Sequence, residues 1–89
     1  MDWKEESGGL YKQFMFTNFL EAFNFMQEIA KVAEEKQHHP RWENEWNKVR
    51  IWLKTHDASD QITDKDHSLA KDIDFIFERF NNKKLTHRT

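Results

Sequence analysis

Cysteine is absent from this 89-residue chain, which excludes a disulfide framework and any thiolate nucleophile. The net charge of −2 offers no strongly basic surface to nucleic acid. No run approaches the roughly 20 apolar residues that span a bilayer, and no charged-then-apolar leader opens the chain. We therefore expect one cytoplasmic domain over residues 1–82, without membrane or nucleic-acid partners, and a polar, disordered tail over 83–89.

Glycine is nearly as scarce, and the only two glycines are adjacent. Gly8-Gly9 predicts a two-residue turn between strands over 3–7 and 10–16. Alternation along this hairpin places four large apolar side chains on one face, namely Trp3, Leu10, Phe14 and Phe16.

Two amphipathic stretches predict helices. From Phe19 to about Lys36 the apolar period is 3.6, and Asn18 with Glu21 forms a capping pair. The predicted buried stripe is Phe19, Ala22, Phe23, Met26, Ile29, Ala30 and Ala33. Phe25 and Val32 lie off that stripe, and either pad its edge or form a subunit contact. A second helix begins at Thr63, with Asp66 at its third position and an apolar side of Leu69, Ile73, Ile76, Phe77 and Phe80.

Between the two helices, residues 41–56 alternate in the manner of a hairpin, with Asn47-Lys48 as its turn. This register places Trp46 opposite Val49, Glu45 opposite Arg50 and, extended outward, His39 opposite His56. The element order β-β-α-β-β-α predicts an α+β fold, a four-stranded antiparallel sheet with helices packed on one face.

Three histidines stand out around this hairpin, the pair His38-His39 just before it, followed by Pro40, and His56 at its far end. Imidazole has an unperturbed pKa of about 6.5, so neighbouring histidines can exchange protons with a bound substrate near neutral pH. Isolated histidines near strand ends are commonly solvated, and the functional interpretation therefore depends on the whole segment.

That segment carries an acidic residue, His-His-Pro, an aromatic residue, Trp-Asn-Lys-Val, Thr-His and a later aspartate. The positions are Glu34, His38, His39, Pro40, Trp42, Trp46, Asn47, Lys48, Val49, Thr55, His56 and Asp66. The pattern resembles the pterin-4a-carbinolamine dehydratases over most of residues 10–74. The resemblance implies this α+β fold and a homodimer or homotetramer, and the chain is expected to lack the family's usual N-terminal helix.

The resemblance also implies a hydro-lyase activity. Its substrate is 4a-hydroxytetrahydrobiopterin, which loses water to give quinonoid dihydropterin in tetrahydrobiopterin recycling, with no cofactor or metal. By motif position, His38 and His56 form the acid–base pair and His39 anchors the pterin. The predicted hairpin register instead pairs His39 with His56, and a bulge at Pro40 would reconcile the two.

Four further residues are assigned to substrate binding, and for three of them a structural role competes. Glu34 orients His38 or faces solvent, and Trp42 stacks on the pterin or packs in the core. Asp66 polarises a histidine or holds the pterin ring, or it completes the cap of the helix that Thr63 begins. The fourth, Pro40, adjoins the histidines, and the loop over 57–63 is one residue longer than the family's usual turn.

Two rival functions remain open. Histidine is a common metal ligand, but adjacent histidines on a strand point to opposite faces and no thiolate is available. The thirteen aromatic residues (8 Phe, 4 Trp and 1 Tyr) exceed what a core of this size readily covers, which favours self-association. The same surplus fits a non-catalytic protein-interaction module on this scaffold.

Overall fold

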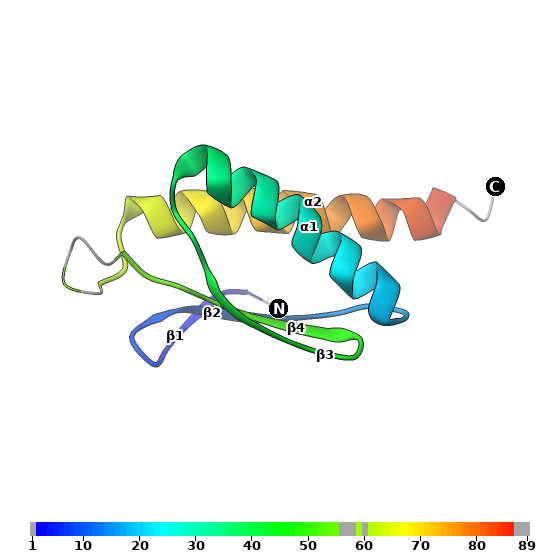
Figure 1. Cartoon of the computed structure of the whole chain (residues 1–89), viewed down its shortest axis with the longest axis horizontal. Coiled ribbons are helices and arrows are strands. Elements are labelled where there is room, and N and C mark those ends of the chain that lie inside the picture. The colour runs from blue at the N-terminus through cyan, green and yellow to red at the C-terminus, as the bar shows by residue number, and fades with distance from the viewer. Residues whose placement is uncertain (1, 56–58, 60, 87–89) are drawn as a thin grey trace.

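The computed structural model describes residues 2–55, 59 and 61–86, with the backbone alone for 81–86. The elements are β1 (Lys4–Glu6), β2 (Gly9–Met15), α1 (Phe19–Lys36), β3 (Arg41–Glu45), β4 (Lys48–Leu53) and α2 (Asp64–Thr86). All strand pairs are antiparallel, in the order β1-β2-β4-β3, and both helices lie on one face of the sheet (Figure 1). The predicted α+β architecture is confirmed.

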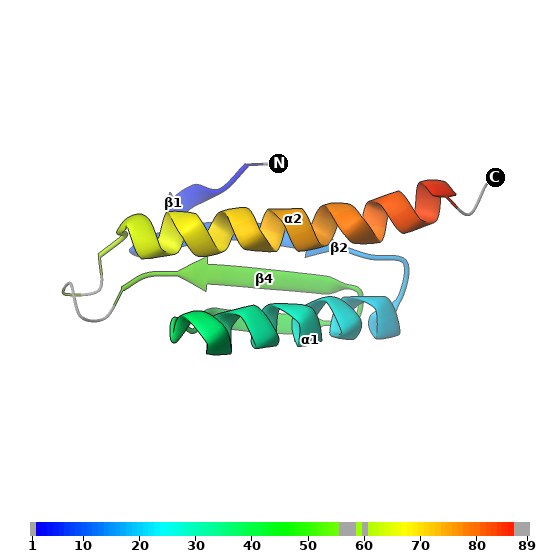
Figure 2. The same cartoon turned by 90° about the horizontal axis from the view of Figure 1, so that it is seen from above.

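Seen from above, α2 runs along the β1–β2 side of the sheet and α1 along the β4–β3 side (Figure 2). The apolar face of the sheet is therefore covered by both helices. Among the described residues, neither helix has an apolar stretch long enough to cross a membrane.

The first hairpin turns one residue earlier than predicted. Glu6 pairs with Gly9, so the turn is Ser7-Gly8, and both turn residues have positive φ (55° and 81°). Such a turn matches the right-handed twist of its strands. The predicted apolar face is confirmed, since Leu10, Phe14 and Phe16 are buried and the Trp3 ring lies 5.8 Å from that of Phe14.

Gly9 is the first residue of β2, and the backbone at the end of β4 lies close to it. A Cβ atom at this position would lie 2.8 Å from the Leu53 carbonyl oxygen. We expect Gly9→Ala to lower the free energy of unfolding by about 1–3 kcal/mol, since backbone must move. Gly8→Ala is the control, because a Cβ there meets nothing within 4 Å and only its φ of 81° opposes alanine. Urea unfolding measures both, and a smaller loss for Gly9→Ala than for Gly8→Ala would contradict the close approach of the strands.

Helix α1 has the predicted bounds and the predicted cap. The Asn18 side chain accepts a hydrogen bond from the Glu21 N–H, and the Glu21 carboxylate accepts one from the Thr17 N–H, each at 2.9 Å. This reciprocal arrangement satisfies two backbone donors that a helix start leaves unpaired.

The predicted buried stripe of α1 is confirmed at Ala22, Ile29 and Ala33 and is wrong along one edge. The fully covered positions are Ala22, Phe25, Ile29 and Ala33, whereas Phe19, Phe23 and Ala30 are exposed. Phe25 is no edge residue or subunit contact, because its ring lies within 5.9 Å of four others, those of Phe14, Phe16, Phe77 and Phe80. These rings come from β2, the segment that follows it and α2, so the position of neighbouring elements decides which helix face is covered.

The second hairpin is shifted by two residues from the predicted register. Glu45 pairs with Lys48 and Glu43 with Arg50, so the turn is Trp46-Asn47. The parity of the strands is unchanged, and Val49, Ile51 and Leu53 are buried as expected. Trp46 is 63% exposed at the tip of the turn, with a φ of 52°. Trp46 therefore does not lie opposite Val49, nor Glu45 opposite Arg50, although the Arg50 guanidinium still reaches the Glu45 carboxylate at 3.2 Å.

Helix α2 presents the predicted apolar side to the core. Leu69, Ile73 and Ile76 are buried, and Phe77 and Phe80 are partly buried against them. The helical backbone continues through residues 83–86, which the sequence analysis placed in the polar tail. Residues 87–89 lie outside the described residues.

Candidate active site

The end of α1 positions the two adjacent histidines. Gln37 adopts the left-handed conformation, with φ of 52° and ψ of 42°. Its N–H donates to the Glu34 carbonyl, and the His38 N–H donates to the Ala33 carbonyl at 3.0 Å. This C-terminal cap turns the chain sharply, and β3 begins only at Arg41. His38 and His39 therefore lie in a connection rather than in a strand, with Pro40 at its end.

Asp66 is the charged residue most deeply placed in this region. It is fully buried at the start of α2, where its Oδ2 accepts from the Thr63 N–H and from the Thr55 hydroxyl, each at 2.8 Å. The Thr63 hydroxyl in turn lies 2.7 Å from the Thr55 hydroxyl. The predicted cap is confirmed, and the same carboxylate also faces the histidine segment, where its role in the reaction stays a prediction.

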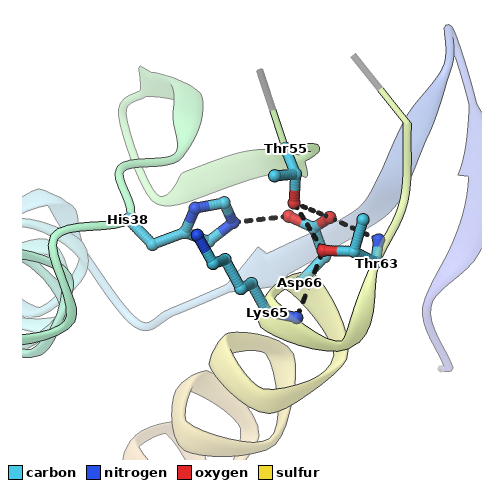
Figure 3. A network of polar contacts seen from close by, with 5 residues as sticks. All are labelled: His38, Thr55, Thr63, Lys65 and Asp66. Atoms are coloured by element: carbon cyan, nitrogen blue, oxygen red, sulfur yellow. Dashed lines mark hydrogen bonds and ion pairs between the residues drawn. The ribbon is translucent and has the colours of Figure 1, made fainter. Parts of the chain in front are cut away.

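His38 completes this network, as Figure 3 shows. Its Nε2 lies 2.6 Å from Asp66 Oδ1, and its side chain is 11% exposed. An ionised carboxylate only accepts hydrogen bonds, so Asp66 selects the tautomer in which Nε2 carries the hydrogen. The lone pair is then on Nδ1, which has no hydrogen-bond partner within the described part of the chain. This arrangement leaves His38 Nδ1 available to accept a hydrogen bond from a bound ligand.

His39 has a different environment. Its Nε2 lies 3.0 Å from Glu34 Oε1, and the two side chains are 59% and 73% exposed. Glu34 was predicted to orient His38 or face solvent. It does face solvent, and its carboxylate pairs with His39 rather than with His38. The capping turn at Gln37 sets this pairing, because it places His39 back over the last turn of α1.

The hydrogen bond from His39, followed by the charge attraction between the two side chains, lowers the pKa of Glu34. Because folding lowers the pKa of this carboxyl group, the pair stabilises the folded protein fully at pH values above the unfolded-state pKa of glutamate. That contribution is lost as the pH falls through the lowered pKa. Because Glu34 is exposed, solvent screens the pair.

A hollow of about 310 Å³ opens beside the two histidines. Its lining residues are Gln37, His38, His39, Pro40, Arg41, Lys54, Thr55 and Lys65. The Lys65 side chain extends from α2 toward the His38 ring (Figure 3). Pro40 thus borders the hollow as predicted, whereas Trp42 is not among the lining residues and packs partly buried against the core.

The third predicted histidine, His56, lies outside the described residues. Its predicted pairing with His39 rested on the register that the structure corrects, since strand pairing ends at Arg41 with Trp52. Extending the observed register places Lys54 opposite His39. Thr55, which precedes His56, is buried and holds Asp66.

Several site residues were missed by the sequence analysis. Thr55 was noted only as a motif position and Thr63 only as a cap, yet both hydrogen-bond within the Asp66 network. Gln37, Arg41, Lys54 and Lys65 line the hollow without having been assigned to it. Gln37 and Arg41 lie next to the histidine pair and Pro40 in the sequence, and this closeness could have identified them as site residues. Within the described ranges, no group of three or more histidine or carboxylate side chains is placed to hold a metal ion.

Comparison with known proteins shows a consistent family relationship. A family model described as Pterin 4 alpha carbinolamine dehydratase matches residues 1–76. A Prochlorococcus marinus protein, provisionally named as a pterin-4-alpha-carbinolamine dehydratase, is 51% identical over 74 residues, which are 83% of this chain and 76% of the relative.

Two solved structures share the fold. A Brucella melitensis protein described as a transcriptional coactivator/pterin dehydratase is 34% identical, with a TM-score of 0.77, over 83% of this chain and 80% of its own. A pterin dehydratase-like protein described as a RuBisCO assembly factor in the alpha-carboxysome is 21% identical, with a TM-score of 0.73, over 86% and 90%. The latter likeness concerns the fold alone. On the family match and its relatives, this chain belongs to the pterin-4a-carbinolamine dehydratase family.

Proposed function

We propose that this protein is a 4a-hydroxytetrahydrobiopterin dehydratase that acts in cytoplasmic recycling of a pterin cofactor. The observation that carries the proposal is the placement of His38 between the buried Asp66 carboxylate and the adjoining hollow. The family relationship supports the substrate class.

The proposed reaction consists of two proton transfers. One proton reaches the 4a-hydroxyl, which leaves as water when the C4a–O bond breaks, and one proton is removed from N5. The N5 electron pair forms the new C=N bond of quinonoid dihydropterin, so no electrons are transferred to or from another molecule. This chemistry requires neither a cofactor nor a metal, and imidazole suits both transfers.

His38 is proposed to exchange a proton through Nδ1, because Asp66 occupies its other nitrogen. His39 is proposed to hold the pterin at the mouth of the hollow, where its exposed ring is tethered by Glu34. His56 is proposed as the second member of the acid–base pair, on motif position alone.

The direct test is a stopped-flow or coupled assay with freshly generated 4a-hydroxytetrahydropterin, with and without a chelator. We expect wild type to accelerate loss of water well above the spontaneous rate, unchanged by chelation. A wild-type rate equal to the spontaneous rate would overturn the proposal. A non-catalytic interaction module would give that result, but it has no need of a buried carboxylate directed at a histidine.

We also propose that the protein forms a homodimer or homotetramer. The first half of α1 carries an exposed apolar strip, defined as Phe19, Leu20 and Phe23, in which the Phe19 and Phe23 rings stack at 6.2 Å. Apolar strips of this kind on small proteins commonly mark protein–protein contacts.

Sedimentation at micromolar concentration tests this surface. We expect wild type to sediment as an oligomer and Leu20→Glu to shift the protein toward monomer, because a carboxylate would be buried unpaired in the contact. His67→Glu adds a carboxylate at an exposed position of α2 and is the control. If wild type is a monomer, or if both variants respond equally, the strip is not the contact between subunits.

A further inference from the structure

A second hollow of about 310 Å³ adjoins the candidate active site and shares a wall with it. Its lining residues are Ser7, Gly9, His39, Arg41, Trp52 and Lys54. Three of these, His39, Arg41 and Lys54, also line the hollow beside His38. Because these residues line both hollows, a substituent on a ligand in the first hollow can contact Arg41 and Lys54.

The shared wall is positively charged. Arg41 and Lys54 line both hollows and Lys65 lines the first, while none of the described lining residues is acidic. The two nearby carboxylates already have partners, since Asp66 is buried behind His38 and Glu34 pairs with His39 of the shared wall. Arg41 has one weak ion pair, to exposed Glu43 at 3.9 Å, and Lys54 and Lys65 have none within the described part of the chain.

Arg41 is also held in position before any ligand arrives. Its guanidinium lies 4.3 Å from the centroid of the Trp52 ring, a cation–π contact on the helix-free face of the sheet. The Trp52 ring is braced by Tyr11, whose ring centroid lies 5.0 Å away. An arginine fixed in this way loses little side-chain freedom on binding, and its planar fork matches phosphate and carboxylate oxygens.

The chemistry of the proposed substrate connects the two hollows. In a pterin, N5 is bonded directly to C6, the carbon that bears the variable side chain. If the histidine segment acts at C4a and N5, the C6 substituent leaves the ring next to that segment. It then extends along the wall that His39, Arg41 and Lys54 form.

We propose that this protein prefers pterins whose C6 side chain ends in an anionic group, a phosphate ester or a carboxylate, bound by Arg41 and Lys54. The preference rests on the proposed pterin dehydration and narrows its substrate, because tetrahydrobiopterin has an uncharged C6 side chain and would then bind more weakly than an anionic pterin. Arg41 and Lys54 are then specificity residues, and proton transfer remains with the histidines.

Binding of a matched series of stable pterins tests the preference. The probes are 6-hydroxymethyl-7,8-dihydropterin, its phosphate monoester and the 6-carboxylate, measured by calorimetry at low and high salt. We expect the phosphate ester to bind wild type at least about tenfold more tightly than the neutral alcohol at low salt. That ratio should shrink as salt screens the charges. Comparing the ester with the carboxylate shows which anion the wall favours.

Substitutions of the shared wall decide whether it carries the preference. Arg41→Gln and Lys54→Gln should each bring the ratio of ester to alcohol affinity toward one. Lys71→Gln removes the same charge from an exposed position on α2 and should leave the ratio unchanged. Equal changes in all three variants would show a diffuse effect of net charge and would overturn the proposal.

The two proposals fail in different ways. If wild type binds the alcohol and the ester equally well but still dehydrates 4a-hydroxytetrahydropterin, the anion preference is wrong. The proposed dehydratase function is then unaffected. Absence of binding by every pterin, together with absence of dehydration, overturns both.

Discussion

Replacing His38 with alanine is expected to lower kcat for dehydration of 4a-hydroxytetrahydropterin by about 10²–10³-fold. His38 is the histidine whose proton position is fixed by a buried carboxylate, through the 2.6 Å contact with Asp66. Without the imidazole, water must transfer the proton in place of a proton acceptor that Asp66 holds in a fixed orientation. Because binding contacts of the pterin ring are largely retained, KM should change less than kcat.

His67→Ala is the matched control for this experiment. His67 is exposed on α2, only one residue from Asp66, and does not line the hollow. Its replacement should leave kcat within about twofold of the wild-type value, which corresponds to a negligible change in the activation free energy. If His38→Ala retains the wild-type kcat while circular dichroism shows a folded protein, the role assigned to His38 is wrong.

Asp66→Asn is expected to reduce both activity and stability. The carboxylate accepts hydrogen bonds from the Thr63 N–H, from the Thr55 hydroxyl and from His38. An amide of the same size replaces one acceptor oxygen with an NH₂ donor. Either the contacts to Thr55 and Thr63 become unfavourable, or His38 must change to the tautomer that accepts at Nε2, and the stronger hydrogen bonds of a charged carboxylate are lost. We expect a loss of about 2–4 kcal/mol in the free energy of unfolding.

The effect of Asp66→Asn on activity has a separate origin. An NH₂ group that faces Nε2 selects the opposite tautomer of His38, with its hydrogen on Nδ1, and an amide oxygen at the same place is an uncharged, weaker acceptor, so kcat should fall at least about tenfold. Thr55→Val is the control, because it removes one hydroxyl of the same network at nearly constant volume and leaves the Asp66–His38 contact. Urea unfolding and the dehydration assay, run on both variants, separate the two effects. Equal losses of kcat in both would show that Asp66 acts only through packing.

Local periodicity predicted the elements but could not fix how the second hairpin is paired. The turn falls on Trp46, a bulky residue with a φ of 52° that local preferences disfavour. Contacts beyond the turn select this geometry. The Asn47 side chain donates to the Phe16 carbonyl at 2.9 Å, and the Phe16 N–H donates to the Asn47 carbonyl. Phe16 follows β2, so a partner 31 positions away decides the register.

The buried face of α1 illustrates a similar limit. Two overlapping stripes of helical period are available on this helix, one through Phe19 and Phe23 and one through Phe25 and Ile29. Only the second meets the sheet and α2, where the Phe25 ring contacts rings from both. Sequence periodicity identifies a helix with an apolar face, and the docking of the other elements selects which face is covered.

The motif identified which residues gather at the site better than it identified their partners. His38, Pro40 and Asp66 were predicted as site residues, and the structure brings His38 to Asp66 and places Pro40 at the hollow. Asp66 contacts His38 and Glu34 contacts His39 because Gln37 ends α1 in the left-handed conformation. No local sequence pattern predicts that conformation. The proposed roles of the histidines, including that of His56, remain predictions.

A crystal structure of the protein with bound 7,8-dihydropterin would test the central claim most directly. We predict that the pterin occupies the hollow beside the histidines, with N5 or the C4a position within about 3.5 Å of His38 Nδ1 and Asp66 still on Nε2. A pterin bound elsewhere, or a His38 ring turned away from both the ligand and Asp66, would contradict the assignment of proton transfer to this residue.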